Sequence, residues 1–386
     1  MIKQVLVIIS TFLACATMMA TPDNATLDSS DKDDSTGSTL AQQLDIQKTG
    51  GDTIDWLADV ASRIQIHGYA QGWYYFQNAG GKRSNSFLCK RTVFWVNAKI
   101  TERWSFQFMH DFNSVVQEYF TDFRITRNNA LTIRFGQFKH GLSYENPLSP
   151  TAMETIDVYS EGVTYLTGCG SDPLNGVQYG REQGLAFLGE TNTKFLKYEL
   201  DILNGSGINV KDKDNNKIVV GRIELHPTNN LTLCATGQIG KGTSLVSAPI
   251  FNHKIAKDSI YTRNSFTIGF NIKTESFGLH GEFLTGKDAD VTSRGAYLTG
   301  SGSIVPGKWD LVGSYDYFNF NTDNKCDMHK VVAGFQYWFF KRCRFQMQYV
   351  YKSANTDYKT FFNNGRNGTK QENCHALMCQ MQVRFN

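Results

Sequence analysis

The chain has 386 residues, a net charge of +3 and a charged fraction of only 19%. Phe (27), Tyr (17) and Gly (34) are frequent while Pro (7) is scarce, which favours a strand-rich fold over long helices. After the first 20 residues no stretch approaches the ~20 apolar residues of a membrane-spanning helix, so a membrane location requires a β-barrel. We expect no nucleic-acid partner for this composition.

Residues 1–20 are predicted to be an export signal peptide. Lys3 supplies the positive start, Val5 to Ala14 form a short apolar core, and small residues follow. Ala14-Cys15-Ala16 and Ala20 offer cleavage sites. Lipidation at Cys15 is the alternative, and it is disfavoured by Phe12 at the third position before it.

Residues 21–63 have a different composition from the rest of the chain. They hold nine Asp against Lys32, Lys48 and Arg63, in a background of Ser, Thr and Gly. Such a polar, acidic segment cannot bury enough apolar surface to fold by itself, so we expect it to be disordered. The remainder, residues 64–386, is more basic than the whole chain and is predicted to form the folded domain.

From Ile64 onward, apolar and polar residues alternate with a period of two, which places one set on each face of a strand. Leu196 to Ile202 and Phe266 to Lys273 show this most clearly. The pattern predicts strands at 64–77, 86–100, 103–113, 116–126, 129–139, 176–189, 194–204, 217–226, 229–239, 261–273, 276–287, 292–304, 307–319, 328–340, 342–353 and 373–386.

The lengths of the connections decide between a soluble sandwich and a barrel. Connections after even-numbered strands are short, whereas the long ones, 140–175, 205–216, 240–260, 320–327 and 354–372, all follow odd-numbered strands. A transmembrane antiparallel β-barrel of about 16 strands is built in this way, with short periplasmic turns and long extracellular loops. A soluble sandwich has no reason to sort its loops. Heating changes the gel migration of a barrel but would not change that of a sandwich.

Several stretches resemble one family of such barrels. They are His67-Gly68-Tyr69-Ala70-Gln71-Gly72, Lys90-Arg91 through Lys99-Ile100-Thr101-Glu102-Arg103-Trp104-Ser105-Phe106, Ile133-Arg134-Phe135-Gly136-Gln137-Phe138-Lys139, Glu145-Asn146-Pro147, Asn204-Gly205-Ser206-Gly207 and Gly221-Arg222-Ile223-Glu224. Across residues 64–386 the chain resembles the phosphate-selective porin O and P family in its Bacteroidetes-like form. The resemblance implies a homotrimer in the lipid of a Gram-negative outer membrane that passes small solutes. It also implies that any anion or phosphate preference comes from basic side chains lining the pore.

The longest connection is expected to fold into the lumen, as it commonly does in sixteen-stranded porins. Between Lys139 and Arg181 it has no Lys or Arg. Its acidic residues Glu145, Glu154, Asp157 and Glu161 are therefore candidates for the constriction.

If the apolar face of each strand meets lipid, the other face lines the lumen. The basic residues assigned to it are Arg91, Lys99, Arg124, Arg134, Lys197, Arg222, Arg263, Lys273, Lys330, Arg344, Lys352 and Arg384. The acidic ones are Asp111, Glu118, Asp122, Glu199, Asp201, Glu224, Glu282, Asp310 and Asp316. Because guanidinium can hold phosphate or carboxylate in a bidentate fork, Arg91, Arg124, Arg134 and Arg222 are the preferred pore-lining candidates, followed by Lys99 and Lys197. The alternative is that these groups form salt bridges that stiffen the wall.

The cysteines and histidines give no sign of catalysis or of a metal site. Eight Cys, including Cys15, show no metal-ligand spacing, and a Cys326–Cys374 disulfide is the minority alternative to free thiols. There is no GxSxG motif and the His are scattered, so we expect neither an enzyme nor a cofactor. The sequence predicts an outer-membrane porin for passive diffusion of small hydrophilic solutes, with an anion or phosphate preference. The alternative is a substrate-specific channel for organic acids or sugars, for which Tyr69 and Trp95 could line the path.

Overall fold

The computed structural model describes residues 59 and 62–385, except 171, 173, 175, 213, 245–254, 325 and 356–372. The chain divides into two units, Met1–Leu57 and Ala58–Asn386. The predicted signal peptide and nearly all of the acidic segment lie outside the described residues. Among those residues, no helix is long and apolar enough to cross a bilayer.

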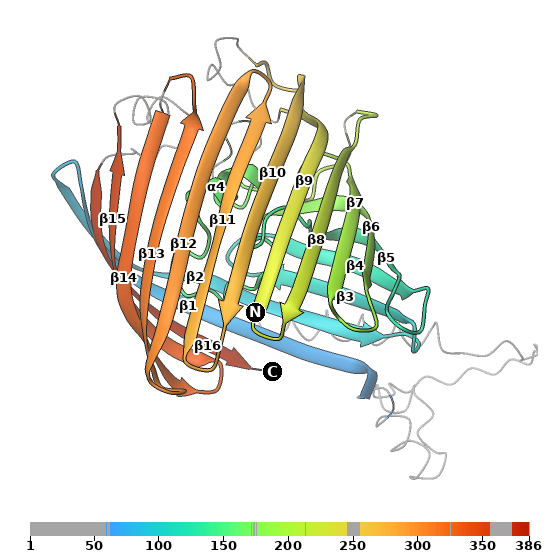
Figure 1. Ribbon diagram of the computed structural model, residues 1–386, viewed down its shortest axis with the longest axis horizontal. Coiled ribbons are helices and arrows are strands. Elements are labelled where there is room, and N and C mark those ends of the chain that lie inside the picture. The colour runs from blue at the N-terminus through green and yellow to red at the C-terminus, as the bar shows by residue number, and fades with distance from the viewer. Residues whose placement is uncertain are drawn as a thin grey trace, which may run out of the picture. The chain divides into compact units, whose positions relative to one another are not determined.

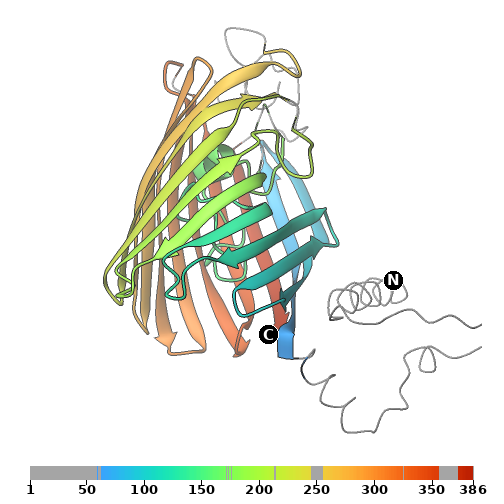
Figure 2. The ribbon, with the colours of Figure 1, turned by 90° about the vertical axis from the view of Figure 1, so that its right-hand side faces the viewer.

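Sixteen antiparallel strands close into one barrel, in which each strand pairs with its chain neighbours and β1 pairs with β16 (Figures 1 and 2). They are β1 (Ile64–Ala79), β2 (Lys82–Lys99), β3 (Trp104–Asp111), β4 (Val116–Arg124), β5 (Thr132–Lys139), β6 (Arg181–Glu190), β7 (Leu196–Leu203), β8 (Ile218–Thr228), β9 (Leu231–Thr243), β10 (Ile260–Lys273), β11 (Phe277–Asp288), β12 (Val291–Val305), β13 (Trp309–Asn321), β14 (Cys326–Phe340), β15 (Cys343–Ala354) and β16 (Cys374–Phe385). Closure leaves no strand edge unpaired, which is the condition for a sheet to cross a bilayer.

The predicted fold is confirmed, and the strand ends differ for local reasons. β1 and β2 extend until only Gly80 and Gly81 separate them, because both glycines take left-handed φ values of 56° and 82° and close a tight turn. β6 begins at Arg181 rather than near 176, since Gly176 and Gly180 also have positive φ and belong to the preceding loop. The expected long connection 320–327 shrinks to 322–325.

The connections sort as predicted. Those after even-numbered strands are short, and the longest ones, 140–180, 204–217, 244–259 and 355–373, follow odd-numbered strands. We call the two rims of the barrel the short-turn end and the long-loop end accordingly (Figure 1).

The barrel wall is apolar on its outer face and polar on its inner face, the reverse of the arrangement in a soluble protein. On β10, Phe266 and Ile268 are 48% and 53% exposed on the outside, whereas Ser265 and Thr267 are buried on the inside. Other strands repeat this alternation, with exposed Phe283, Leu311 and Val383 on the outside and buried polar groups on the inside. Because large apolar side chains gain nothing from contact with water, this outer face fits a hydrocarbon surrounding.

Candidate functional site: the lumen and its inward loop

The connection between β5 and β6, residues 140–180, turns into the barrel, and we call it the inward loop. It carries the short helix α4 (Glu161–Leu166), which lies within the ring of strands (Figures 1 and 2). Ser160 caps α4 by accepting a hydrogen bond from the amide of Val163. The amide of Glu161 donates to the Asp316 carboxylate on β13 over 2.7 Å, so the wall satisfies a second free amide of the helix.

One face of α4 packs on the inside of the barrel. Val163, Tyr165 and Leu166 are buried in a cluster that includes Leu284 of β11 and Phe318 of β13. Gly162 allows this contact, because a Cβ there would come within 2.2 Å of a Leu284 methyl carbon. Burying side chains of this size typically contributes about 1.5–3 kcal/mol each. The inward loop is thus held on part of the wall by an apolar core inside the barrel.

A set of buried glutamines holds the middle of the inward loop. Gln348 uses both ends of its amide: its carbonyl accepts from the Ile156 amide at 2.9 Å, and its nitrogen donates to the Glu154 carbonyl at 2.7 Å. Gln346 donates to the same carbonyl at 2.8 Å, and Gln382 donates to the Thr151 carbonyl at 3.3 Å. Neutral amides can satisfy a loop backbone without adding charge to the lumen.

Two arginines of the wall hold the two ends of the inward loop. Near its start, Arg222 pairs with Glu224 and donates to the carbonyls of Gly141 (3.1 Å) and Ser143. Near its end, Arg263 of β10 meets Asp172 at 2.5 Å and Asp288 at 3.4 Å. The side chains of Arg263, Asp172 and Asp288 are almost completely buried, so this ionic contact is strongly desolvated.

The structure places the four acidic constriction candidates differently from one another. Glu145 is buried, accepts from the Ser160 amide at 2.9 Å and lies 3.3 Å from His280. Glu161 pairs with Lys352 at 3.2 Å and Lys330 at 3.5 Å. Glu154 is partly buried, 3.9 Å from His280. Asp157 is exposed. Wall lysines therefore neutralise Glu161, Glu145 and Glu154 share the imidazole of His280, and Asp157 is the exposed carboxylate of the four.

The strand register gives the six basic candidates the same parity as residues that are buried or touch the inward loop, and their role in lining the pore stays a prediction. Arg134 forms a bidentate pair with Asp122 at 2.7 and 2.8 Å and covers the Phe120 ring. Arg222 is occupied by Glu224 and the inward loop. The salt-bridge alternative therefore applies to these two.

The other four basic candidates have no carboxylate within 4.0 Å among the described residues. Arg91 donates to the Gln71 side chain at 3.0 Å. Arg124, Lys99 and Lys197 are exposed near the short-turn end.

Sequence reasoning missed Lys90 as a neighbour of Arg91. The register between β1 and β2 shifts here, with Gln71 opposite Arg91 but Gly72 opposite Cys89, so Lys90 is an extra bulged residue. As a result both cations lie over the ring of Trp73, at 5.1 Å for Lys90 and 5.9 Å for Arg91. A period-two pattern assigns adjacent residues to opposite faces, so it carries no signal for this pair.

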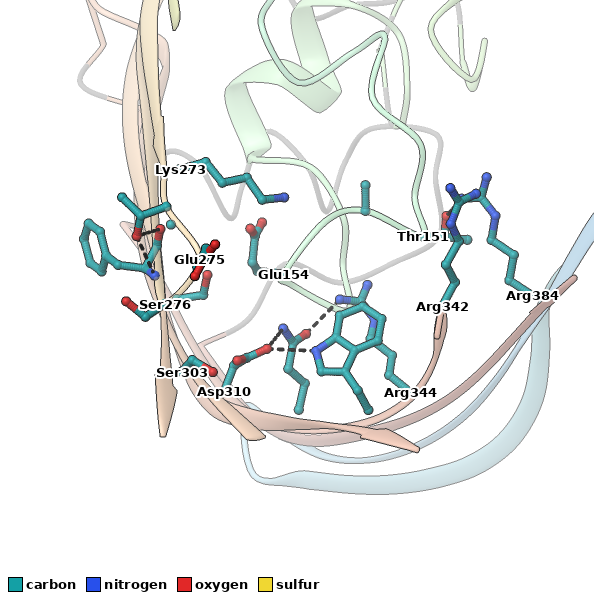
Figure 3. A pocket seen from close by; sticks show the side chains of 17 residues that line it. Thr151, Glu154, Lys273, Glu275, Ser276, Ser303, Asp310, Arg342, Arg344 and Arg384 are labelled. Carbon is teal, nitrogen blue, oxygen red and sulfur yellow. Dashed lines mark hydrogen bonds between the residues drawn. The ribbon is translucent and has the colours of Figure 1, made fainter. Parts of the chain in front are cut away.

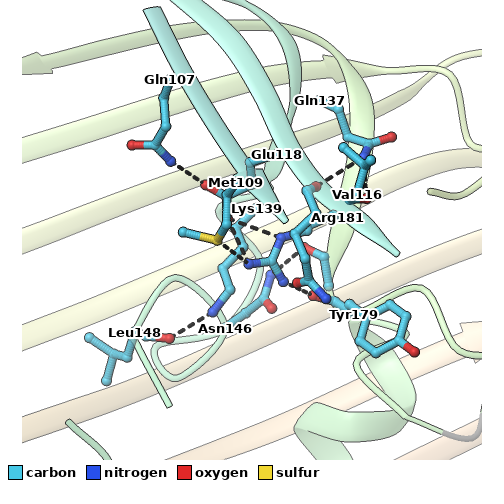
Figure 4. A network of polar contacts seen from close by, with 12 residues as sticks. Gln107, Met109, Val116, Glu118, Gln137, Lys139, Asn146, Leu148, Tyr179 and Arg181 are labelled. Atoms are coloured by element: carbon cyan, nitrogen blue, oxygen red, sulfur yellow. Dashed lines mark hydrogen bonds and ion pairs between the residues drawn. The ribbon is translucent and has the colours of Figure 1, made fainter. Parts of the chain in front are cut away.

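Sequence reasoning also missed a polar network where β5 and β6 meet the inward loop (Figure 4). Arg181 pairs with Glu118 of β4 at 2.7 Å, and both are nearly buried. Lys139 donates to the Leu148 carbonyl at 2.7 Å and to the Tyr159 hydroxyl at 2.8 Å. Lys139 and Arg181 lie directly before and after the inward loop. That position in the sequence is the observation from which the network could have been predicted.

The minority alternative of a Cys326–Cys374 disulfide is wrong, since the structure does not join these two cysteines by a disulfide.

No protein-family model and no curated protein matches this sequence. Solved structures do match the shape. An anion-selective porin from Comamonas acidovorans aligns with TM-score 0.58 at 11% identity, over 83% of this chain and 99% of that one. The trimer form of OmpT from Vibrio cholerae aligns with TM-score 0.57 at 12% identity, over 84% and 100%. The outer-membrane channel DcaP of Acinetobacter baumannii aligns with TM-score 0.56 at 12% identity, over 83% and 97%.

The chain has the fold of these outer-membrane porins and channels. At such low identity the likeness is one of architecture, and the chemistry of the lumen has to be read from this chain's own residues.

The contact of Glu161 with two lysines leads to a prediction about pH. Burial alone would raise the pKa of Glu161, but Lys352 and Lys330 outweigh it and lower the pKa to about 2. The pKa of Glu161 in the folded protein lies below its ordinary value of 4.5. The ion pair therefore contributes its full stabilisation above about pH 4.5 and loses it as the pH falls through about 2. We therefore expect single-channel traces to stay equally quiet from neutral pH down to about pH 5.

A Glu161→Gln variant is expected to show added current noise across that whole range, because α4 loses its ionic contact with β14 and β15. Asp323→Asn, in the exposed β13–β14 turn, is the matched control. Equal noise in Glu161→Gln and the parent would mean that the apolar face of α4 suffices to dock it.

Proposed function

We propose that the chain is an outer-membrane porin through which small hydrophilic solutes diffuse passively, with a preference for anions. The observation that carries the proposal is a closed sixteen-stranded barrel with an apolar outside, a charged inside and a connection folded into its lumen. Such a barrel needs no moving part or energy source to pass solutes. In this proposal the short-turn end faces the periplasm and the long-loop end faces the outside of a Gram-negative cell.

The distribution of ion pairs supports the anion preference. Glu161 and Asp172 of the inward loop are paired with wall cations, whereas Lys90 and Arg91 have no carboxylate within 4.0 Å among the described residues. In a narrow channel with walls of low dielectric constant, uncompensated charge of one sign concentrates the opposite ion. The resemblance of residues 64–386 to phosphate-selective porins supports phosphate as one of the permeant anions.

A homotrimer is the proposed assembly. The trimer form of the OmpT structure and the family resemblance both support it. Chemical cross-linking of the purified protein in detergent would show a three-chain band if the proposal is right and only a one-chain band if it is wrong.

The test of the function is the zero-current potential of a planar bilayer that holds the purified protein under a KCl gradient. We expect channels, with a reversal potential of the sign that means chloride passes more readily than potassium. A cation-selective potential would contradict the anion preference but keep the porin. Complete absence of channels, from protein whose gel migration changes on heating, would contradict the porin itself.

A further inference from the structure

A cavity of about 470 Å³ opens inside the barrel at the short-turn end (Figure 3). The inward loop contributes Thr151, Ala152 and Glu154 to its lining, and the rest comes from the ends of β10 to β16 and the turns between them. Arg342, in the β14–β15 turn, and Arg384, near the end of β16, have their guanidinium groups next to each other at one side of this cavity (Figure 3).

Four other arginines of the lumen are neutralised by direct contact with a carboxylate. Arg134 meets Asp122, Arg181 meets Glu118, Arg222 meets Glu224, and Arg263 meets Asp172 and Asp288. Within the described part of the chain, neither Arg342 nor Arg384 has a carboxylate within 4.0 Å.

The acidic residues that line the cavity do not compensate this pair. Asp310 accepts hydrogen bonds from Gln336 and Trp338, each at 2.8 Å. Glu154 is 3.9 Å from His280. Figure 3 shows Glu154, Glu275 and Asp310 away from the side of the cavity where the two guanidinium groups lie.

Arg384 is oriented by its neighbours but not saturated by them. It donates to the Thr151 hydroxyl at 2.5 Å, and its guanidinium lies 5.6 Å from the Trp95 ring centre. Its Nε is buried and has no hydrogen-bond partner among the described residues. Arg344, deeper in the wall, differs because it already donates to the Met153 carbonyl and to Gln336.

Two adjacent guanidinium groups repel each other unless an anion lies between them. A phosphate or carboxylate group has several acceptor oxygens in the geometry that matches guanidinium forks, whereas chloride has no such directionality. The Thr151 hydroxyl adds a donor or acceptor on the loop side.

We propose that Arg342, Arg384 and Thr151 form a binding site for a small oxyanion, with a phosphate or carboxylate group, at the short-turn end of the lumen. The site rests on the proposed function only for the route by which the anion reaches it. It would hold solute at the end where, in that proposal, the channel opens into the periplasm.

The test is equilibrium binding of inorganic phosphate to the purified full chain in detergent, at constant ionic strength set with KCl. We expect saturable binding, and a loss of about tenfold in affinity for Arg342→Gln and for Arg384→Gln, the usual scale for a charged hydrogen-bonding partner. Lys341→Gln is the matched control, since it removes the same charge from the same turn but does not line the cavity. Arg342→Lys keeps the charge without the fork, and it should bind more weakly than the parent.

Succinate in place of phosphate distinguishes the two sources of the oxyanion. Competition between them supports one shared site, and binding of either alone identifies the group that the site accepts. Absence of saturable binding by both, or an equal loss for Lys341→Gln and Arg342→Gln, would overturn the site. Because the measurement needs no membrane, an anion-selective channel without binding contradicts this site alone, and binding without channels contradicts the porin alone.

Discussion

Replacing Arg263 by methionine is expected to release the end of the inward loop from the wall and to raise the mean single-channel conductance. Arg263 holds Asp172 of the loop at 2.5 Å and Asp288 of β11 at 3.4 Å. The Tyr165 hydroxyl, on α4, also donates to Asp288 at 2.7 Å. Without the guanidinium, two buried carboxylates face each other with no cation between them.

The size of the effect follows from that desolvation. Removing one partner of a buried ion pair typically costs about 3–5 kcal/mol. The loop can escape the penalty by moving Asp172 into water, so the docked state should become at least about a hundredfold less favoured relative to the undocked state. The barrel ladder itself is unchanged, so the heat-modifiable gel migration should stay as in the parent.

The measurement is single-channel conductance and its variance in a planar bilayer at neutral pH. Arg294→Met is the matched control, because Arg294 lies two strands away from Arg263, on β12, and is exposed on the outer face. Conductance and noise equal to the parent in Arg263→Met would show that the apolar cluster around α4 holds the loop without this anchor.

The strands could be predicted because their signal is local. On β10, Phe266, Ile268 and Phe270 alternate with polar residues, and this alone fixes the strand and its lipid face. The same parity assigns the charged residues to the inner wall, and that assignment stays a prediction. The sorting of short and long connections then identified the closed barrel with no knowledge of which strands pair.

The state of those inward charges could not be predicted, since it depends on contacts between distant parts of the chain. The Gln348 side chain accepts from the Ile156 amide across 192 residues of sequence, and the local sequence around neither residue predicts this contact. Arg134 and Arg222 looked like equally good anion contacts to Arg91 by parity, but each is occupied by a carboxylate. The lumen position of Lys90 was missed for a different reason. The β2 bulge at Lys90 breaks the period-two alternation from which the inner face was assigned.

Replacing both Lys90 and Arg91 by glutamate is expected to turn an anion-preferring channel into one that prefers cations. The β2 bulge directs both side chains to the Trp73 ring on the lumen face, so their charges act at one level of the pore. Asp157 of the inward loop is exposed and lies within electrostatic reach of Lys90, so the native charges of the wall and the loop have opposite signs. The double substitution makes the charge of the wall negative, like the charge of the inward loop at Asp157.

Coulomb's law sets the scale. Unit charges about 4 Å apart interact by about 1 kcal/mol in water, so reversing one wall charge changes an ion's energy by about 2 kcal/mol with opposite sign for anion and cation. Allowing for screening by salt, we expect the anion-to-cation permeability ratio to fall at least about tenfold. The measurement is the zero-current potential under a KCl gradient, repeated at low and high salt, with the larger effect at low salt.

Two further variants separate the local field from net charge. The double replacement of Lys82 and Arg83 by glutamate makes the same charge change at the exposed start of β2 and should leave the potential near that of the parent. Asp157→Asn removes the opposing loop charge and should shift selectivity further toward anions. If the Lys82 and Arg83 variant moves the potential as far as the Lys90 and Arg91 variant does, selectivity follows the total charge of the barrel and the bulge has no special part in it.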